Sequence, residues 1–333
     1  MSPLATIKDV AKKAGVALST ASYALNGSTK ISASTREKVL SAAKELNYLK
    51  SGPASDLKKN RTKTIALLLS DLSGPFYSEL IRGVQEIVLE NGYDLIAVSS
   101  YADESSTAAR FLREARTDGV ILLAHNINTD FVLNSAREGF PIIALDREVI
   151  GNPNIISISV NNSRGAYEAT EHLINSGCRS VAHISGPANS KDSQERLAGY
   201  KQALADFNTP SLYKWILNGK FTQEGGYEAT KMLIHQGDLP EGIFYGNDEM
   251  AIGGLNALKE YEIRVPEDIS IIGFDDIQLA PYLRPPLTTM RQPKYEIGKL
   301  ASHVLFQLLA GESVSSHYTF DAELISRESV RLF

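Results

Sequence analysis

Carboxylate and amide side chains stand at the ends of short apolar runs in the part of the chain that follows residue 63. Asp71, Asp146, Asn247 and Asp275 each come within two residues of a run rich in Ile, Leu or Phe. Such side chains bond to hydroxyl groups, while aromatic rings offer flat apolar faces to sugar-like rings. This mixture predicts a binding site for a polyhydroxylated ligand, to which Phe76, Tyr77, Arg147, Arg196 and Phe221 also contribute.

The same residues have plainer structural interpretations. Asn247 and Asp276 are typical helix caps, and Asp146 next to Arg147 is a typical surface ion pair. The aromatic candidates are also ordinary core residues. The combination of types favours the ligand site more than any single member does.

The elements that position these residues alternate between short apolar strands and amphipathic helices. The sequence predicts strands at Thr64–Leu69, Asp94–Val98, Gly119–Leu123, Pro141–Leu145, Ile155–Val160, Ser180–Ser185, Tyr213–Leu217, Gly242–Tyr245 and Ile269–Phe274. Predicted helices include Phe76–Glu90, Asn162–Ser176, Arg196–Phe207 and Asn247–Tyr261. This rhythm is typical of an α/β fold with parallel sheets, in which ligands lie beyond the carboxyl ends of the strands. The two sets of strands predict two lobes.

The first fifty residues have a different pattern. Thr6 with Asp9 forms a capping-box pattern, and a short amphipathic helix follows until Gly15. A second helix is expected at about Leu18–Asn26, with Ala21, Ala24 and Leu25 buried. A third begins near Ser32 or Ser34 and ends at Asn47-Tyr48. The pattern indicates a three-helix, helix-turn-helix headpiece that reads DNA, and a small helical bundle without a DNA role is the alternative.

Charge supports nucleic acid as the partner of this segment. The whole chain has a formal net charge of −5, yet residues 1–63 hold 12 Lys and Arg against 4 Asp and Glu. A basic segment on an acidic body is expected when only that segment meets phosphate. A lysine-rich solvated surface is the structural alternative.

Other function classes lack their sequence patterns. The chain shows no Gly-rich dinucleotide fingerprint, P-loop, nucleophile elbow or metal-spaced His pair, so we expect neither an enzyme nor a metal or cofactor. Cys178 is the single cysteine, which fits a reducing compartment. Because no signal peptide or membrane span is visible, we expect a cytoplasmic protein that does not contact membranes.

The headpiece residues resemble those of the lactose-repressor/galactose-repressor family of bacterial transcription factors. The resemblance runs through Thr6-Ile7-Lys8-Asp9-Val10-Ala11, Ala14-Gly15-Val16, Ser22, Asn26-Gly27, Thr35-Arg36-Glu37 and Glu45-Leu46-Asn47-Tyr48. It implies that Leu18, Ser19 and Tyr23 face base edges in the major groove. It implies backbone-phosphate contacts for Thr6, Ser22, Asn26, Thr35 and Tyr48.

Three features depart from the family pattern or match it loosely. Many members carry Arg where Tyr23 stands, and the usual Ser N-cap of the second helix is Ala17. Between headpiece and body, residues 51–63 match a hinge that in the family folds on DNA and inserts a leucine, here Leu57, into the minor groove. Asp56 is unusual there, and a plain polar linker is the alternative.

The resemblance extends over the body through motifs such as Pro75-Phe76-Tyr77, Ala198-Gly199-Tyr200, Asn247-Asp248-Glu249 and Gly273-Phe274-Asp275-Asp276. It implies a two-lobed body similar to periplasmic sugar-binding proteins. The implied domains are a headpiece at 1–50, a hinge at 51–63, and an effector-binding and dimerisation body at 64–333. The N-lobe would hold about 64–160 and 291–319, and the C-lobe about 161–290 and 320–333. The implied effector contacts are Phe76, Tyr77, Asp146, Arg147, Arg196, Phe221, Asn247 and Asp275.

The sequence therefore predicts a DNA-binding transcriptional repressor that binds a pseudo-palindromic, double-stranded operator as a homodimer. The resemblance implies control by a small-molecule effector in the cleft between the lobes, with a sugar or sugar phosphate as the favoured class and a purine as the other. Control by a phosphorylated protein co-regulator is the alternative from another class. A sugar-binding transport protein would leave the headpiece unexplained.

Overall fold

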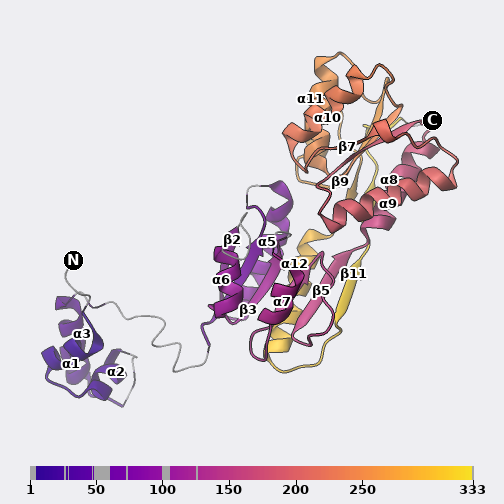
Figure 1. The fold of residues 1–333 in the computed structure, drawn as a ribbon. Coiled ribbons are helices and arrows are strands. Elements are labelled where there is room, and N and C mark those ends of the chain that lie inside the picture. The colour runs from indigo at the N-terminus through magenta and orange to yellow at the C-terminus, as the bar shows by residue number, and fades with distance from the viewer. Residues whose placement is uncertain are drawn as a thin grey trace. The chain divides into compact units, whose positions relative to one another are not determined.

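The computed structural model describes residues 5–25, 28, 30–46, 48, 61–72, 74–99, 106–124 and 127–331. The chain divides into two compact units, Met1–Thr62 and Lys63–Phe333, called here the headpiece and the body (Figure 1). Asn26 and Leu57, with the rest of the predicted hinge up to residue 60, lie outside the described residues. Their predicted DNA contacts therefore stay predictions.

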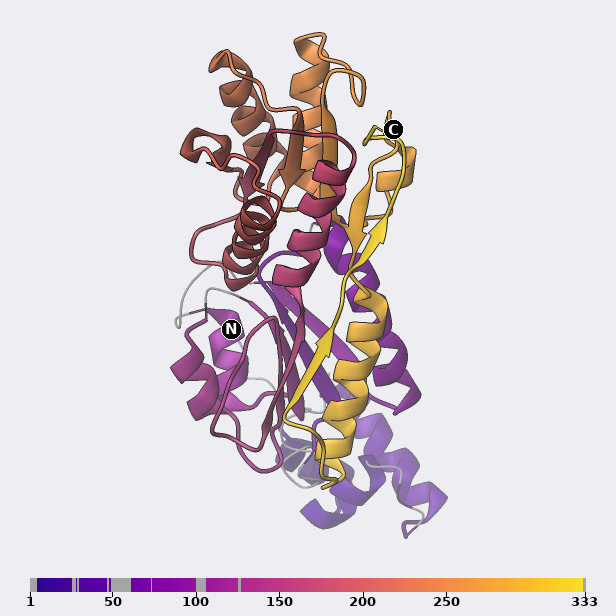
Figure 2. The same cartoon turned by 90° about the vertical axis from the view of Figure 1, so that its right-hand side faces the viewer.

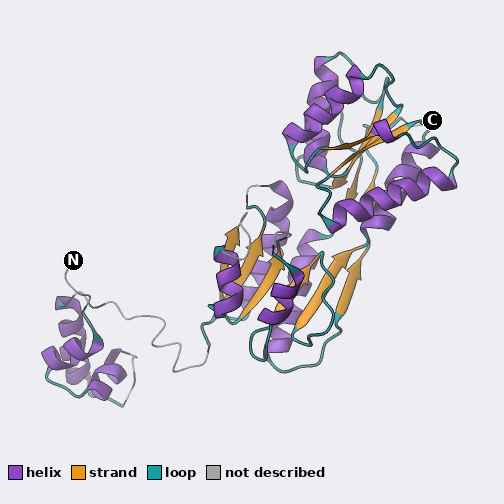
Figure 3. Cartoon of the chain, viewed as in Figure 1, coloured by secondary structure: helices purple, strands orange, loops and turns teal. Residues whose placement is uncertain are grey.

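The described part of the headpiece consists of three helices around one small core (Figure 3). They are α1 (Ile7–Ala14), α2 (Leu18–Leu25) and α3 (Ala33–Glu45). The core residues are Val10, Ala11, Ala21, Ala24, Val39, Ala42 and Ala43. Because most of these side chains are small, the helices approach one another closely and leave their outer faces to solvent.

The headpiece helix ends follow the local sequence. The predicted capping box is confirmed: Asp9 N donates to Thr6 Oγ1 over 3.4 Å, and Thr6 N donates to Asp9 Oδ2 over 2.8 Å. Gly15 ends α1 with a left-handed φ of 66°. Of the two predicted starts for α3, Ser32 is the cap, since its hydroxyl accepts from Thr35 N over 3.2 Å. Ser34 instead lies inside the first turn.

One lobe of the body, the N-lobe, contains a six-stranded parallel sheet in the order β11-β5-β4-β3-β1-β2. Its strands are β1 (Thr64–Leu69), β2 (Asp94–Ser99), β3 (Gly119–Leu123), β4 (Ile142–Leu145), β5 (Ile155–Val160) and β11 (His317–Phe320). Its helices are α5 (Pro75–Glu90), α6 (Thr107–Glu114), α7 (Thr129–Ser135) and α12 (Lys294–Leu309). Helices α5 and α12 cover one face, and α6 and α7 the other.

The other lobe, the C-lobe, has a six-stranded sheet in the order β12-β10-β9-β8-β6-β7. Its strands are β6 (Val181–Ser185), β7 (Ile216–Asn218), β8 (Gly242–Tyr245), β9 (Ser270–Asp275), β10 (Thr289–Arg291) and β12 (Glu323–Ile325). Its helices are α8 (Asn162–Asn175), α9 (Lys191–Asp206), α10 (Gln223–His235) and α11 (Asp248–Glu260), with 3-10 turns at Tyr213–Trp215 and Ala280–Tyr282. Only the β10–β12 pair is antiparallel among the described strands.

The chain passes between the lobes three times. It leaves the N-lobe after β5, returns between β10 and α12, and crosses again between β11 and β12. Figure 2 shows the last passage as the yellow segment that leads from β11 in one sheet to β12 in the other. These passages bring residues far apart in sequence to the boundary between the lobes.

Two sequence predictions of local structure are wrong. The strand predicted at Tyr213–Leu217 begins only at Ile216, because Tyr213–Trp215 forms a 3-10 turn. The helix predicted to start at Arg196 starts at Lys191, so Arg196 lies inside α9. In the described parts of the chain, no helix is both long enough and apolar enough to span a lipid bilayer.

Candidate functional site

The outer face of α2 carries the side chains predicted to read DNA bases. Leu18 is 46% exposed and Tyr23 is 47% exposed, although both have large hydrophobic side chains. Ser19 is exposed between them. A surface helix that presents Leu and Tyr to solvent has chemistry suited to thymine methyls and base edges.

The residues predicted to contact backbone phosphates differ in their burial and in their hydrogen-bond partners. Thr6 Oγ1 donates to Asp9 Oδ2 over 2.6 Å, and Thr35 Oγ1 lies 2.8 Å from Ser32 Oγ. Tyr48 is half-buried and packs against the headpiece core, while Ser22 is half-buried on α2. Thr6 and Thr35 thus belong to helix caps, and their predicted contacts with DNA stay predictions.

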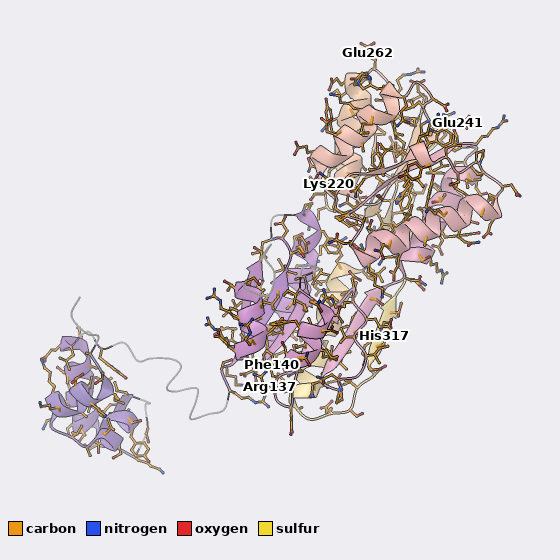
Figure 4. All side chains as sticks on the ribbon, viewed as in Figure 1. Arg137, Phe140, Lys220, Glu241, Glu262 and His317 are labelled. Carbon is orange, nitrogen blue, oxygen red and sulfur yellow. The ribbon has the colours of Figure 1, made fainter. Side chains whose placement is uncertain are left out.

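A cavity of about 690 Å³ lies between the two lobes of the body. Seven of the eight predicted effector residues line it, namely Phe76, Tyr77, Asp146, Arg196, Phe221, Asn247 and Asp275. Arg196 lies inside α9, and the other six come from strand ends and the starts of helices in both lobes, where parallel sheets collect ligand-binding groups. Lys220, also in the lining, lies at the end of the C-lobe that faces the N-lobe (Figure 4).

Arg196 forms part of the cavity wall and is only 4% exposed. Its guanidinium donates to Asn162 Oδ1 over 2.9 Å and to the carbonyl of Gly246. The guanidinium carbon lies 3.8 Å from the centre of the Phe274 ring. These contacts fix a delocalised cation at the cavity, with a stacked ring below it.

Asp275 faces this cation from the end of β9. Asp275 Oδ1 lies 3.7 Å from Arg196 Nη1 and accepts from Gln292 Nε2 over 2.7 Å. Burial raises the pKa of Asp275 to about 6, although Arg196 and Lys294 act in the opposite direction. The carboxylate is thus held by donors on two sides, which orients it for a ligand hydroxyl.

Asp146 supplies a second carboxylate from the N-lobe, at the end of β4. It has a left-handed φ of 50°, and its Oδ1 accepts from Val160 N over 3.3 Å. Burial raises the pKa of Asp146 to about 7, and the nearby charge of Asp192 adds to the rise. Asp146 therefore favours its neutral form more than a solvated carboxyl does.

Asn247 and Phe221 support each other. Asn247 caps α11 by accepting from Met250 N over 3.0 Å, and its amide donates to the carbonyl of Phe221 over 3.3 Å. The Phe221 ring packs against Gly186, where an added Cβ would lie 2.2 Å from the ring. Capping and ligand contact are therefore compatible roles for Asn247, and Gly186 makes room for the ring.

Phe76 and Tyr77 open α5 on the N-lobe side. Their rings meet edge to face with centres 5.3 Å apart. Both are half-buried and line the cavity, so part of each ring stays open to a ligand.

Arg147 differs from the other seven candidates. It is outside the cavity lining, and its guanidinium donates to the carbonyls of Ala124, over 2.9 Å, and Ile127, over 2.5 Å. The structure records no ion pair between Arg147 and Asp146 among the described residues. Arg147 thus binds two main-chain carbonyls that follow β3, and its predicted effector contact stays a prediction.

Sequence reasoning missed several charged residues of the lining. Asp192 lies one helical turn before Arg196, and their charged groups are 4.0 Å apart. Lys220 precedes Phe221, and Glu249 follows Asn247 by two residues. Their spacing from the chosen residues was a usable signal, because neighbours at helix starts share the same cavity edge.

Lys294 gave no such signal. A lone lysine in the first turn of a helix reads as a surface residue, yet Lys294 is 2% exposed at the boundary between the lobes. Its burial follows from the passage of the chain between β10 and α12.

Comparisons with known proteins agree with both units. The family model described as bacterial regulatory proteins of the lacI family matches residues 6–51, and one described as a periplasmic binding protein-like domain matches residues 170–330. The HTH-type transcriptional repressor PurR of Photobacterium profundum is 36% identical over 332 residues, covering 98% of this chain and 99% of the relative. The ribose operon repressor of Escherichia coli is 38% identical over 309 residues, covering 91% and 92%.

Solved structures give the same result. The lac repressor dimer bound to operator and the anti-inducer ONPF has a TM-score of 0.76 at 27% identity, covering 99% of this chain and all of that one. A complex of the regulator CelR with cellobiose has a TM-score of 0.71 at 29% identity, covering 98% and 99%. A family regulator from Enterococcus faecium with bound ribose has a TM-score of 0.73 at 27% identity, covering 80% and 98%. With its helix-turn-helix headpiece and two-lobed body, the chain belongs to the LacI family of bacterial regulatory proteins, which are DNA-binding transcriptional regulators.

Proposed function

We propose that this regulator represses transcription from a pseudo-palindromic operator and that an uncharged sugar in the interlobe cavity controls it. The observation that carries the proposal is the cavity itself. It combines aromatic rings, an amide, carboxylates and one buried guanidinium from both lobes, in a chain that also has an exposed reading helix.

The charges of the cavity favour an uncharged sugar over a sugar phosphate. The acidic lining residues are Asp71, Asp146, Asp192, Glu249 and Asp275, against two basic ones, Arg196 and Lys220. Asp146 favours its neutral form, but the other four still outnumber the two cations. Arg196 already has acceptors in Asn162 and Gly246. A phosphate dianion would enter a site of like charge, whereas hydroxyl groups can donate to carboxylates at no such cost.

Similar proteins support the sugar class. The E. faecium regulator was solved with ribose, and CelR with cellobiose. We therefore propose a sugar as the effector of this chain, without choosing between ribose and cellobiose. The domains in this proposal are a headpiece at 1–50, a hinge at 51–63 and the body from 64 onward, which acts in the cytoplasm as a homodimer and catalyses no reaction.

A thermal-shift screen of the full chain tests the ligand class. D-ribose, cellobiose and D-glucose are compared with ribose 5-phosphate, glucose 6-phosphate and nucleobases. A ligand at about 100 times its Kd stabilises the folded state by about 2.7 kcal/mol, which moves the melting temperature measurably. We expect a shift with an uncharged sugar and a smaller one with its phosphate. A larger shift with the phosphate contradicts the charge argument, and no shift with any compound contradicts small-molecule control.

Selection from random duplexes tests the DNA half of the proposal. A dimer that places two headpieces in successive major grooves should recover a two-fold symmetric site. Sedimentation of the chain with the selected DNA should give two chains per duplex. Recovery of only asymmetric or unrelated sequences contradicts the dimeric repressor.

A further inference from the structure

Lys294 is a buried charge at a passage between the lobes. It is the first residue of α12, which packs on the N-lobe sheet, and it follows β10 of the C-lobe by three residues. Only 2% of its surface is exposed. A buried ammonium is stable only where acceptors replace its water, so its partners are informative.

The partners of Lys294 belong to both lobes. Nζ donates to the main-chain carbonyls of Asp275 and Asp276, the second over 3.2 Å, at the carboxyl end of β9 in the C-lobe. Nζ also lies 3.4 Å from Glu79 Oε2, on α5 of the N-lobe. One side chain therefore joins a corner of the C-lobe to a helix of the N-lobe.

The corner that Lys294 holds is an unusual piece of backbone. Asp275 has a φ of 115° and Asp276 a φ of 49°, both in the region that favours glycine. The Asp275 carboxylate lines the cavity, and the Asp276 carboxylate pairs with Arg291 over 2.7 Å and Arg327 over 2.6 Å. Two carbonyls anchored on one ammonium help to keep this corner in place.

We propose that Lys294 and Glu79 form a positioning pair that couples the occupied cavity to α5. The inference rests on the proposed function of the cavity as the effector site. Neither residue is assigned a contact with the ligand.

The coupling has a physical basis in where the partners sit. Any relative movement of the lobes at this passage changes the distance from Nζ either to Glu79 or to the two carbonyls. Losing a partner of a buried charge is costly, so the pair favours one lobe arrangement over others. Helix α5 also carries Phe76 and Tyr77 into the cavity, so Glu79 lies one turn from ligand-facing residues. A ligand shifts the equilibrium between lobe arrangements only through its own contacts, and the Lys294–Glu79 pair sets how strongly one arrangement is favoured before the ligand binds.

A matched control lies on the same two helices. Lys299 Nζ of α12 is 2.8 Å from Glu86 Oε1 of α5, and both side chains are about one-third exposed, at 33% and 38%. The recorded partners of Lys299 are Glu86 and Tyr295, both in the N-lobe, whereas Lys294 Nζ also donates to carbonyls of the C-lobe. Removing the Glu86 charge tests the α5–α12 packing without touching the passage between lobes.

The experiment compares Glu79→Gln, Glu86→Gln and Lys294→Met in the full chain. Sugar affinity is measured by calorimetry with D-ribose, cellobiose or D-glucose, whichever gives the largest thermal shift. The affinity for the selected operator is then measured with and without saturating sugar, and the ratio of the two is the coupling factor. We expect Glu79→Gln to keep the sugar Kd within about twofold and to reduce the coupling factor by about fivefold or more. Glu86→Gln should match the wild type in both.

Lys294→Met should weaken sugar binding as well, because the Asp275 corner loses its anchor. The double variant, Glu79→Gln with Lys294→Met, should have the same coupling factor as Lys294→Met alone, because each change removes the same Lys294–Glu79 interaction. If Lys294→Met does not fold, the comparison of Glu79→Gln with Glu86→Gln still tests whether the Lys294–Glu79 pair carries the coupling.

Unchanged coupling in Glu79→Gln would overturn the inference, and so would an equal loss in Glu86→Gln, which would indicate general weakening of the helix pair. In both cases the wild type still responds to sugar, so the proposed function stands. A wild type whose operator affinity does not respond to any of the three sugars overturns the proposed function and this inference together.

Discussion

The headpiece and the body differ in how they hold their recognition residues. Leu18, Ser19 and Tyr23 lie on one eight-residue helix, exposed, with no need of distant partners for their placement. Arg196 and Asp275 are almost completely buried, and each depends on residues from other elements. The difference indicates that changes on α2 should act on DNA alone, whereas changes in the cavity should spread through shared contacts.

The largest effect is expected from Arg196→Met. The change removes a buried cation and leaves Asp275 and the Gly246 carbonyl without its donors. Breaking such a network costs about 3–5 kcal/mol, which would abolish measurable sugar binding and lower the melting temperature of the body. Calorimetry measures both, and operator binding without sugar should persist. Sugar binding within about tenfold of the wild type would contradict the assigned role of Arg196.

The next effect concerns the other side of the comparison. Tyr23→Ala removes an exposed side chain predicted to touch base edges, and should weaken operator binding by about 1–3 kcal/mol. Fluorescence anisotropy with labelled operator measures the loss. The sugar Kd should be unchanged, because Tyr23 and the cavity belong to separate units. A changed sugar Kd in operator-free protein would break the distinction between local and distributed recognition.

A pH experiment isolates Asp146. Its pKa in the folded body is about 7, against about 3.9 when unfolded, so folding favours uptake of a proton. This contribution to stability is full below about pH 4 and is lost as the pH rises through about 7. We expect the melting temperature of the wild-type body to fall more between about pH 5 and pH 7.5 than that of Asp146→Asn. Calorimetric scans at matched ionic strength measure it, and parallel slopes would refute the prediction.

His183 contributes to stability with the opposite pH dependence. It is completely buried, and burial lowers its pKa to about 4. A histidine with a lowered pKa stabilises the fold above about pH 6.5 and loses that contribution as the pH falls through about 4. Its effect therefore opposes that of Asp146 and is concentrated at lower pH.

The smallest effect is expected at Ala17. Ala17 precedes α2, and its carbonyl accepts from Ala21 N over 3.0 Å, but its side chain offers no cap. Ala17→Ser should stabilise α2 by about 1 kcal/mol. Amide hydrogen exchange of α2 in the full chain should slow by about fivefold, while exchange in β9 stays constant. Faster exchange in α2 would show that the serine does not cap.

Features that depend on local sequence were predicted better than features that depend on distant parts of the chain. In β1, Ile65, Leu67 and Leu69 face one core and Ala66 and Leu68 the other, so the strand is a continuous apolar run that its sequence predicts well. The capping box at Thr6 and Asp9 is likewise local, and the structure confirms it.

Long-range features escaped prediction. Tyr213 and Trp215 were predicted to lie in a strand because they are aromatic and precede an apolar pair. No local sequence signal distinguishes a 3-10 turn from a strand there. Lys294 is buried because three passages of chain meet at the lobe boundary, which no local spacing encodes. Asp275 was predicted from its place after the expected strand Ile269–Phe274, but its partner Gln292, which follows β10, was not predicted.

The central claim is that the cavity is the input and α2 the output of one switch. The most direct measurement titrates the full chain on its selected operator with the uncharged sugar that gives the largest thermal shift, and follows anisotropy alongside calorimetric binding of the same sugar. The account predicts an operator Kd that changes by about fivefold or more, with a midpoint at the sugar concentration that half-fills the cavity. An operator Kd that stays constant while the cavity fills would contradict it.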